Sequence, residues 1–216
     1  MIIAIDGPAG AGKTTISSEV ARRLEYVRLD TGALYRAVAL CALEAGFTPQ
    51  SDGLGGLVEG LNLSFSEDGV TLDGVPLGQR IRTAEMSQAA SAFSAVPAVR
   101  AGLLELQRRI GRSTNSVLDG RDIGTVVFPD AHLKIFLTAS PEERARRRHR
   151  EHIAAGRTIS MEAVLKDIMT RDHADSTRAI APLRQAEDAQ RIDSSDLTIE
   201  ETIEKIVTLA RERAGG

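Results

Sequence analysis

One eight-residue segment constrains this chain more than any other. Gly7-Pro8-Ala9-Gly10-Ala11-Gly12-Lys13-Thr14 matches the pattern G-x-x-x-x-G-K-[ST] at every fixed position. It follows the apolar run 1–5, which is rich in β-branched residues as a buried parallel strand is, and helical periodicity resumes after it. A glycine-rich loop between a buried strand and a helix predicts an α/β domain that binds the phosphates of a nucleoside triphosphate.

The residue types in this loop suit phosphate chemistry. Its glycines leave backbone N–H groups free to converge on phosphate oxygens, and the following helix adds its positive end. Lys13 is expected to reach the β- and γ-phosphates, and the hydroxyl of Thr14 is placed to ligate Mg²⁺ as a cofactor. The predicted ATP-binding residues are Gly7, Pro8, Ala9, Gly10, Ala11, Gly12, Lys13, Thr14 and Thr15.

The rest of the chain alternates between predicted strands and helices. Strands are expected at 26–29, 116–118, 133–137 and 190–192, and helices at 31–45, around 99–110, and after Ser140, Ser160 and Thr198. Between residues 48 and 75 glycines become frequent, and Asp68-Gly69 and Asp73-Gly74 supply turns for small antiparallel hairpins. These features predict a doubly wound parallel sheet (core 1–35, 94–143 and 159–216) with an inserted β-containing lobe (36–93).

Composition excludes several other classes. Only 3% of residues are aromatic and the net charge is -3, which disfavours a nucleic-acid-binding surface. The single Cys41 cannot form an internal disulfide, and no run approaches the roughly 18 apolar residues that a membrane span needs. We therefore expect a cytoplasmic protein without nucleic-acid or membrane partners, and a monomer.

Arginines are concentrated on the helix predicted after Pro141. A helix spreads such residues around much of its circumference, which favours a mobile cover over one flat basic face. Residues 144–158 are therefore predicted to form a short arginine-rich lid; a solvated basic face or a nucleic-acid patch is the alternative. The predicted lid residues are Arg144, Arg147, Arg148, Arg150 and Arg157.

Three further features point to a polar acceptor. Arg100 lies in the first turn of a predicted helix, where a cation opposes the helix dipole, so a binding role is inferred. Asp119-Gly120-Arg121-Asp122 follows an apolar strand, at the end of a sheet where ligands bind; a capped turn is the alternative. Arg171, Asp175 and Arg178 share one helical stripe if the helix extends that far, and a surface salt bridge would also explain that pattern.

Taken together, these segments resemble the bacterial cytidylate kinases, a family of P-loop nucleoside monophosphate kinases. The similarity runs through Ile5–Lys13, Leu29–Arg36, Ile81–Thr83, Asp119–Asp130 and Arg178–Leu183, and it includes the inserted lobe. The family often has Ser-Gly where this chain has Thr31-Gly32. The resemblance implies transfer of the γ-phosphate of ATP to CMP or dCMP in pyrimidine nucleotide metabolism, with 36–93 as the monophosphate-binding lobe.

The resemblance also implies roles for matching residues. Ser91, Arg100 and Asp122 would read cytosine, Arg171 and Asp175 would contact the sugar, and Arg36, Arg121 and Arg178 would bind the acceptor phosphate. Lys13, Arg121 and Arg178 would be catalytic. The CMP-binding set is Thr31, Arg36, Ser91, Arg100, Arg121, Asp122, Arg171, Asp175 and Arg178.

The chemistry of the bases agrees with these roles. Cytosine offers an amino donor and a ring acceptor, which Asp122 and Arg100 complement, whereas uracil offers the reverse pattern and would leave polar groups unpaired. The acceptor phosphate is already ionised near neutral pH, so no catalytic base is needed. Another P-loop kinase acting on UMP, AMP or a small metabolite, and a regulatory or nucleic-acid-dependent ATPase, are the alternatives.

Overall fold

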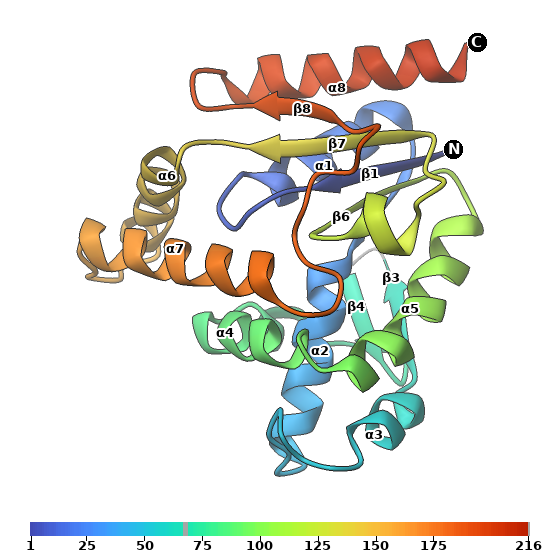
Figure 1. The fold of residues 1–216 in the computed structure, drawn as a ribbon, viewed down its shortest axis with the longest axis vertical. Helices are drawn as coiled ribbons and strands as arrows, with labels where there is room; N and C mark the ends of the chain where they lie inside the picture. Colours follow the sequence, from blue (N-terminus) through green and yellow to red (C-terminus); the bar gives the residue numbers. More distant parts are fainter. Residues whose placement is uncertain (67–68, 216) are drawn as a thin grey trace. The chain divides into compact units, whose positions relative to one another are not determined.

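The computed structural model describes residues 1–66 and 69–215, which form two compact units (Figure 1). Unit 1 consists of Met1–Arg28 and Thr114–Gly216, and unit 2 of Leu29–Ser113. Unit 2 contains the predicted lobe 36–93 and extends beyond it at both ends, to Leu29 and to Ser113. The functional boundaries of the lobe stay a prediction.

A five-stranded sheet in the order β2-β6-β1-β7-β8 forms the centre of unit 1. β1 pairs in parallel with β6 and β7, and β7 pairs in parallel with β8. Every residue of β1 and β6 is buried, as expected for parallel strands covered on both faces. The strands are β1 (Ile2–Asp6), β2 (Val27–Asp30), β6 (Ser116–Gly120), β7 (Leu133–Thr138) and β8 (Gln190–Asp193).

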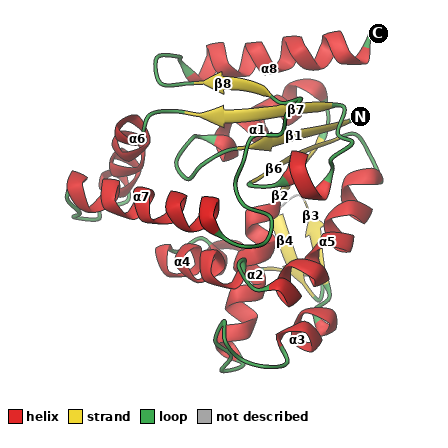
Figure 2. Ribbon diagram, in the orientation of Figure 1, coloured by secondary structure: helices red, strands yellow, loops and turns green. Residues whose placement is uncertain are grey.

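Helices surround this sheet (Figure 2). α1 and α8 pack together, as do α6 and α7, and one π-helix, η2, directly follows β6. An aliphatic core that includes Ile3, Ile5, Val20 and Ile206 joins the sheet to α1 and α8. The helices are α1 (Lys13–Leu24), η2 (Ile123–Val127), α6 (Pro141–Ala154), α7 (Met161–Thr177) and α8 (Ile199–Ala214).

Unit 2 has its own core. α2 (Thr31–Glu44) packs against α4 (Ala84–Phe93), α5 (Pro97–Arg112) and the antiparallel sheet β3-β4-β5. Leu34, Val38 and Phe93 are almost completely buried in this core. The remaining elements are α3 (Leu54–Gly60), β3 (Leu63–Ser66), β4 (Gly69–Leu72), β5 (Val75–Pro76) and the 3-10 helix η1 (Gly78–Ile81).

The predicted fold class is confirmed, and so are several local predictions. Ser140, Ser160 and Thr198 all cap helices with their side chains, and Thr198 forms a complete capping box with Glu201. Leu63–Ser66 and Gly69–Leu72 pair as the antiparallel hairpin that was predicted. Of its two proposed turn dipeptides, Asp73-Gly74 joins β4 to β5, whereas Asp68 lies outside the described residues.

Four elements were not predicted: α3, η1, α4 and η2. α3 carries three glycines in seven residues, a composition that lowers helix propensity, and α4 is a second helix inside the region read as the lobe. β6 extends two residues beyond the predicted strand, so that Asp119 and Gly120 belong to the sheet. The short π-helix after it leaves no recognisable periodicity in the sequence.

No single helix in the described ranges is long and apolar enough to cross a membrane. α4 and α5 meet the length and composition test only together, as a pair bent by 101°.

Candidate active site

The phosphate loop begins where β1 ends, and its first glycine is required by a close approach. Gly7 has φ 154°, and a Cβ atom built there would collide with the backbone carbonyl of Leu137 on β7. No side chain fits between the loop and the neighbouring strand. The local packing therefore explains the first fixed glycine of the motif.

Lys13 starts α1 and its side chain turns back over the loop. Its Nζ donates to the carbonyl oxygens of Gly7 and Pro8, each at 2.7 Å, and the residue is 7% exposed. Burial lowers the pKa of Lys13 well below its ordinary value, and the Arg121 cation lowers it further, against the carboxylates of Asp119 and Asp175. A buried ammonium near a second cation is a ready ligand for a polyanion.

A carboxylate and a guanidinium hold the peptide groups of Ala9. The Ala9 N–H donates to Asp172 Oδ1 at 3.2 Å, and the Ala9 carbonyl accepts from Arg144 at 2.9 Å. Arg144 and Asp172 are themselves paired at 2.5 Å, and Arg144 is 4% exposed. α6 and α7 therefore fix the conformation of the phosphate loop through this clamp.

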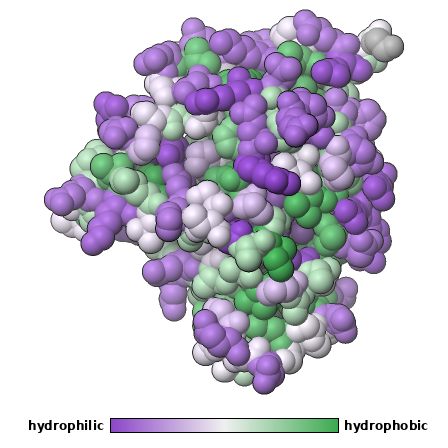
Figure 3. Space-filling view, viewed as in Figure 1, coloured by the Kyte–Doolittle hydropathy of each residue, from purple (hydrophilic) through white to green (hydrophobic). Residues whose placement is uncertain are grey.

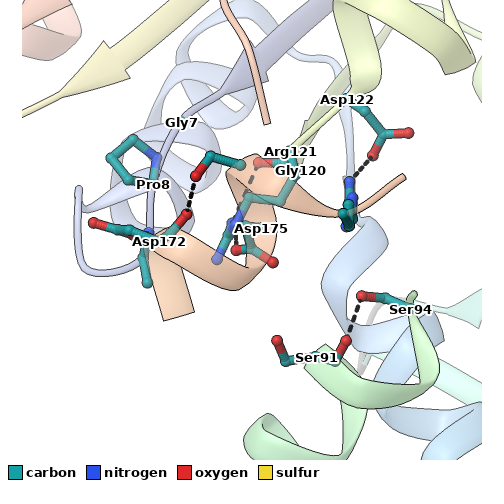
Figure 4. Close-up of polar contacts among 12 residues, drawn as sticks. Gly7, Pro8, Ser91, Ser94, Gly120, Arg121, Asp122, Asp172 and Asp175 are labelled. Atoms are coloured by element: carbon teal, nitrogen blue, oxygen red, sulfur yellow. Dashed lines mark hydrogen bonds and ion pairs between the residues drawn. The ribbon is translucent and has the colours of Figure 1, made fainter. Parts of the chain in front are cut away.

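The acceptor residues predicted in unit 1 form two ion pairs. Arg121 Nε lies 2.7 Å from Asp175 Oδ2, and Arg178 lies 3.3 Å from Asp122 (Figure 4). Burial alone would raise the pKa of Asp175, but the charge of Arg121 and its hydrogen bond outweigh burial, so the pKa is lowered. Burial and the Arg121 charge lower the pKa of Arg171, whose buried Nε has no hydrogen-bond partner.

α7 ends at Thr177, and Arg178 is its C-cap residue. The predicted stripe of Arg171, Asp175 and Arg178 therefore continues one residue past the helix. The structure pairs Arg178 with Asp122, although the resemblance gives these two residues different parts of the nucleotide.

Two further buried carboxylates lie at this edge of the sheet: Asp6 was not predicted, and Asp119 was named only as part of the run 119–122, without a role of its own. Asp6, the last residue of β1, accepts from the backbone N–H groups of Ile123 and Gly124 at 2.8 and 2.7 Å. Burial raises the pKa of Asp6 to about 6, despite these two hydrogen bonds. Asp119 accepts from Ser17 at 2.7 Å and from Arg28 at 3.0 Å. Only their position at the ends of adjacent strands could have indicated them.

Unit 2 holds its predicted site residues with carbonyls, a ring and one carboxylate. Arg100 is 7% exposed, donates to the Ser94 carbonyl at 3.2 Å and lies 5.4 Å from the centre of the Tyr35 ring. The Ser94 hydroxyl in turn donates to the carbonyl of Ser91 at 2.9 Å (Figure 4). Ser94 and Tyr35, neither of which was predicted, thus position two predicted residues.

The remaining predicted residues of unit 2 lie at the start of α2. Asp30 caps this helix by accepting from the Ala33 N–H at 3.0 Å, and its other oxygen accepts from Arg36 at 3.0 Å. Thr31 is the first residue of the helix and is 3% exposed. The N-cap therefore fixes the start of α2 and with it the position of Arg36 on the helix.

The predicted lid residues do not behave as one group. Arg144 is buried in the clamp, and Arg147 donates to the carbonyl of Ser194 at 2.6 Å, so neither stands free as a cover. Each guanidinium is held by backbone carbonyls, those of Ala139 and Ala9 for Arg144 and that of Ser194 for Arg147. Arg148 pairs with Glu151 at 3.5 Å, and Arg150 and Arg157 are exposed. A lid role for these three residues stays a prediction.

The residues present fit a nucleotide-bound Mg²⁺. Thr14 is exposed at the start of α1 and lines a groove of about 520 Å³ with Thr15, Ser18 and Ile203. In the described ranges no three His, Cys, Asp or Glu side chains converge to hold a metal by themselves. One hydroxyl beside a phosphate cradle suits an ion that takes most of its oxygen ligands from phosphates and water.

Comparisons with known proteins agree along the whole chain. The cytidylate kinase family model matches residues 3–212. The chain is 47% identical to a cytidylate kinase of a Geobacter species, over 99% of this chain and 94% of that one. It is 46% identical to a cytidylate kinase of Mycobacterium leprae, over 100% of this chain and 97% of the relative.

Among solved structures, the fold is similar to that of an uncharacterised protein of Eubacterium ventriosum. The TM-score is 0.53 at 12% identity, and the match covers 97% of both chains. At this identity the likeness concerns the fold alone.

Proposed function

The chain belongs to the cytidylate kinase family, and from that premise we propose that it transfers the γ-phosphate of ATP to CMP or dCMP. The products are ADP with CDP or dCDP. The observation that carries the proposal is the full-length family match, together with the buried Lys13 over the phosphate loop. The two ion pairs at the end of β6 supply the polar groups that an acceptor nucleotide requires.

Lys13 and the loop N–H groups would hold the donor. On ATP binding, the β- and γ-phosphates would replace the Gly7 and Pro8 carbonyls as partners of Lys13. The nearby Arg121 favours this exchange, because an anion relieves the repulsion between the two cations. Thr14 would hold Mg²⁺, which neutralises phosphate charge when bound. We expect chelation by EDTA to abolish turnover and added Mg²⁺ to restore it.

The acceptor would be positioned by arginines rather than activated by a base. An oxygen of the CMP phosphate forms the new bond to the γ-phosphorus, while the bond from that phosphorus to the β–γ bridging oxygen breaks and ADP leaves. Arg121 and Arg178 would neutralise the charge that the two phosphates bring together, with Arg36 also on the acceptor phosphate. Arg171 and Asp175 would contact the sugar.

Base selection is assigned to Ser91, Arg100 and Asp122. A carboxylate that accepts from the C4 amino group and a guanidinium that donates to N3 match cytosine and mismatch uracil. The hydroxyl of Thr31 replaces the serine hydroxyl that is frequent in the family. We further propose that the protein acts as a cytoplasmic monomer, which light scattering of the purified protein would test.

One assay tests this function. ADP release is measured with CMP, dCMP, UMP, AMP and dAMP offered singly. We expect strong turnover with CMP and dCMP. Turnover with UMP or AMP but none with CMP would contradict the assignment, and acceptor-independent hydrolysis stimulated by RNA would favour the ATPase alternative.

A further inference from the structure

The buried carboxylate of Asp6 has no role in the chemistry described above. It lies at the carboxyl end of β1, directly before the phosphate loop, and is 5% exposed. Its two oxygens accept from two successive backbone N–H groups, of Ile123 at 2.8 Å and of Gly124 at 2.7 Å. A carboxylate that grips two neighbouring amides fixes the position and the orientation of that backbone segment.

The segment that Asp6 grips begins directly after two predicted acceptor residues. Arg121 and Asp122 precede Ile123, and the π-helix η2 begins at Ile123. The carbonyl of Asp122 accepts from the N–H groups of Val126 and Val127, so Asp122 is part of the same turn. The Asp6 carboxylate at the end of β1 therefore contacts the chain that follows the neighbouring strand β6, one residue after Asp122.

Gly124 shows how closely the two segments approach. A Cβ atom at this position would lie 3.1 Å from the Lys134 side chain and 3.4 Å from Asp6 Oδ2. An alanine would crowd the stem of Lys134, whereas its distance to the Asp6 carboxylate is that of an ordinary van der Waals contact. Gly124 belongs to the backbone segment that Asp6 holds, and each of the two residues can be altered separately.

Keeping a charge at this place is costly. Burial disfavours the carboxylate of Asp6, and the nearby Asp122 adds like-charge repulsion, whereas Lys13 and the two amides favour the charge. An apolar residue would avoid the cost if the only need were to fill the space beneath the loop. The two hydrogen bonds to the Ile123 and Gly124 amides offset the free-energy cost of burying the carboxylate.

We propose that Asp6 is a positioning residue for acceptor selection: by holding the backbone at Ile123 and Gly124, it fixes the orientation in which Asp122 meets the base. This inference rests on the proposed function, since it concerns the same acceptor. Asp6 does not touch the nucleotide in this proposal. It acts through the backbone that carries Asp122.

The test is a kinetic comparison of Asp6→Asn, Gly124→Ala and the wild type with CMP, UMP and ATP varied in turn. Asn keeps the shape of Asp but sets an amide donor against one of the two N–H groups, and Gly124→Ala crowds the same backbone segment against Lys134 without changing a charge. Asp193→Asn is the matched control, because Asp193 ends the edge strand β8 of the same sheet and is half exposed at 50%. Unfolding midpoints identify any variant that is not folded.

We expect both site variants to raise the KM for CMP about tenfold or more and to reduce the preference for CMP over UMP. The KM for ATP should stay within about twofold, and Asp193→Asn should match the wild type. The proposal is overturned if the folded variants keep the wild-type preference, or if the KM values for CMP and ATP rise together. A wild type that does not turn over CMP would instead contradict the proposed function.

Should Asp6→Asn fail to fold, Gly124→Ala decides alone. A folded Gly124→Ala protein with unchanged KM for CMP and unchanged base preference would also overturn the proposal. If the contact were purely structural, the variants would have a lower unfolding midpoint but no difference between their effects on the KM for CMP and the KM for ATP.

Discussion

The two units of this protein hold their predicted site residues in different ways. In unit 1, Lys13, Arg121, Asp122 and Asp175 belong to a network of opposite and like charges at the end of a parallel sheet. In unit 2, Arg100 is held by a carbonyl and an aromatic ring beside an aliphatic core. On the face seen in Figure 3, hydrophilic residues cover most of the area around α8, and hydrophobic residues are visible over unit 2.

This difference suggests separate roles for phosphate-binding cations and base-reading residues. The repulsion between Lys13 and Arg121 in unit 1 is relieved when an anionic phosphate binds between them. In unit 2, by contrast, a neutral carbonyl and an aromatic ring already hold the guanidinium of Arg100. Substitutions of the phosphate-facing cations of unit 1 should therefore affect the chemical step, whereas substitutions of the predicted base readers, Asp122 in unit 1 and Arg100 in unit 2, should mainly affect acceptor binding. The predictions below test this division, beginning with the largest effect.

Lys13→Ala should have the largest effect of any single substitution. Removing the cation over the phosphate loop should lower kcat by about 10³-fold with every acceptor, because one preorganised charge at the transferred phosphate is lost. Steady-state ADP release measures this loss. Lys205→Ala on α8 is the control, and near-normal activity of Lys13→Ala would refute the phosphate-loop assignment.

Substitutions at the predicted base readers should weaken the binding of CMP more than the binding of ATP. Asp122→Ala removes the predicted acceptor for the cytosine amino group and one ion-pair partner of Arg178, so the KM for CMP should rise about 10²-fold. Arg100→Met should raise the KM for CMP with little change in kcat. Equal losses toward ATP and CMP in either variant would break the proposed separation between phosphate-binding cations and base readers.

Asp172→Asn tests the clamp on Ala9. The substitution weakens one hydrogen bond to the loop and removes the charge that Arg144 pairs with, so the KM for ATP should rise about tenfold. The KM for CMP should change less, as a titration of each substrate at saturation of the other would show. A larger effect on CMP than on ATP would place this clamp on the acceptor side instead.

The smallest effect concerns the pH dependence of stability. The pKa of Asp6 is raised to about 6 in the folded protein from 3.8, so the folded state binds the proton more readily between these values. The contribution of Asp6 to stability is therefore present at low pH and is lost as the pH rises through about 6. The charged groups that face Asp6 are Asp122, Lys13 and Lys134.

Urea unfolding at pH 5 and pH 7 measures this contribution. The unfolding free energy of the wild type should fall by about 1 kcal/mol more between these pH values than that of Asp6→Asn. Other carboxylates titrate equally in both proteins, so the difference isolates Asp6. Parallel pH dependence in the two proteins would mean that Asp6 has an ordinary pKa.

Local sequence patterns predicted much of the fold and the donor loop. The β-branched run before Gly7, the capping residues and the turn dipeptides act over a few neighbours, so their consequences can be read directly from the chain. α3 was missed because its glycines disfavour a helix that packing against α5 nevertheless stabilises. Tertiary contacts overrode local propensity there.

The interactions that complete the site could not be predicted in this way. Asp6 meets Ile123 across 117 positions of the sequence, and Asp172 meets Ala9 across 163. Arg144 looked like part of a mobile basic helix, yet its burial against Ala9 makes it part of the loop's support. Such pairs follow from strand order and helix packing, which the printed sequence does not reveal residue by residue.

The most direct test of the account follows the phosphorus nuclei themselves. Phosphorus NMR of the protein with MgATP and CMP should show ADP and CDP appearing in equal amounts, with no free inorganic phosphate beyond background. Transfer that stops in the Lys13→Ala variant would agree with the donor site described here. Release of inorganic phosphate without CDP, or transfer to UMP in preference to CMP, would contradict it.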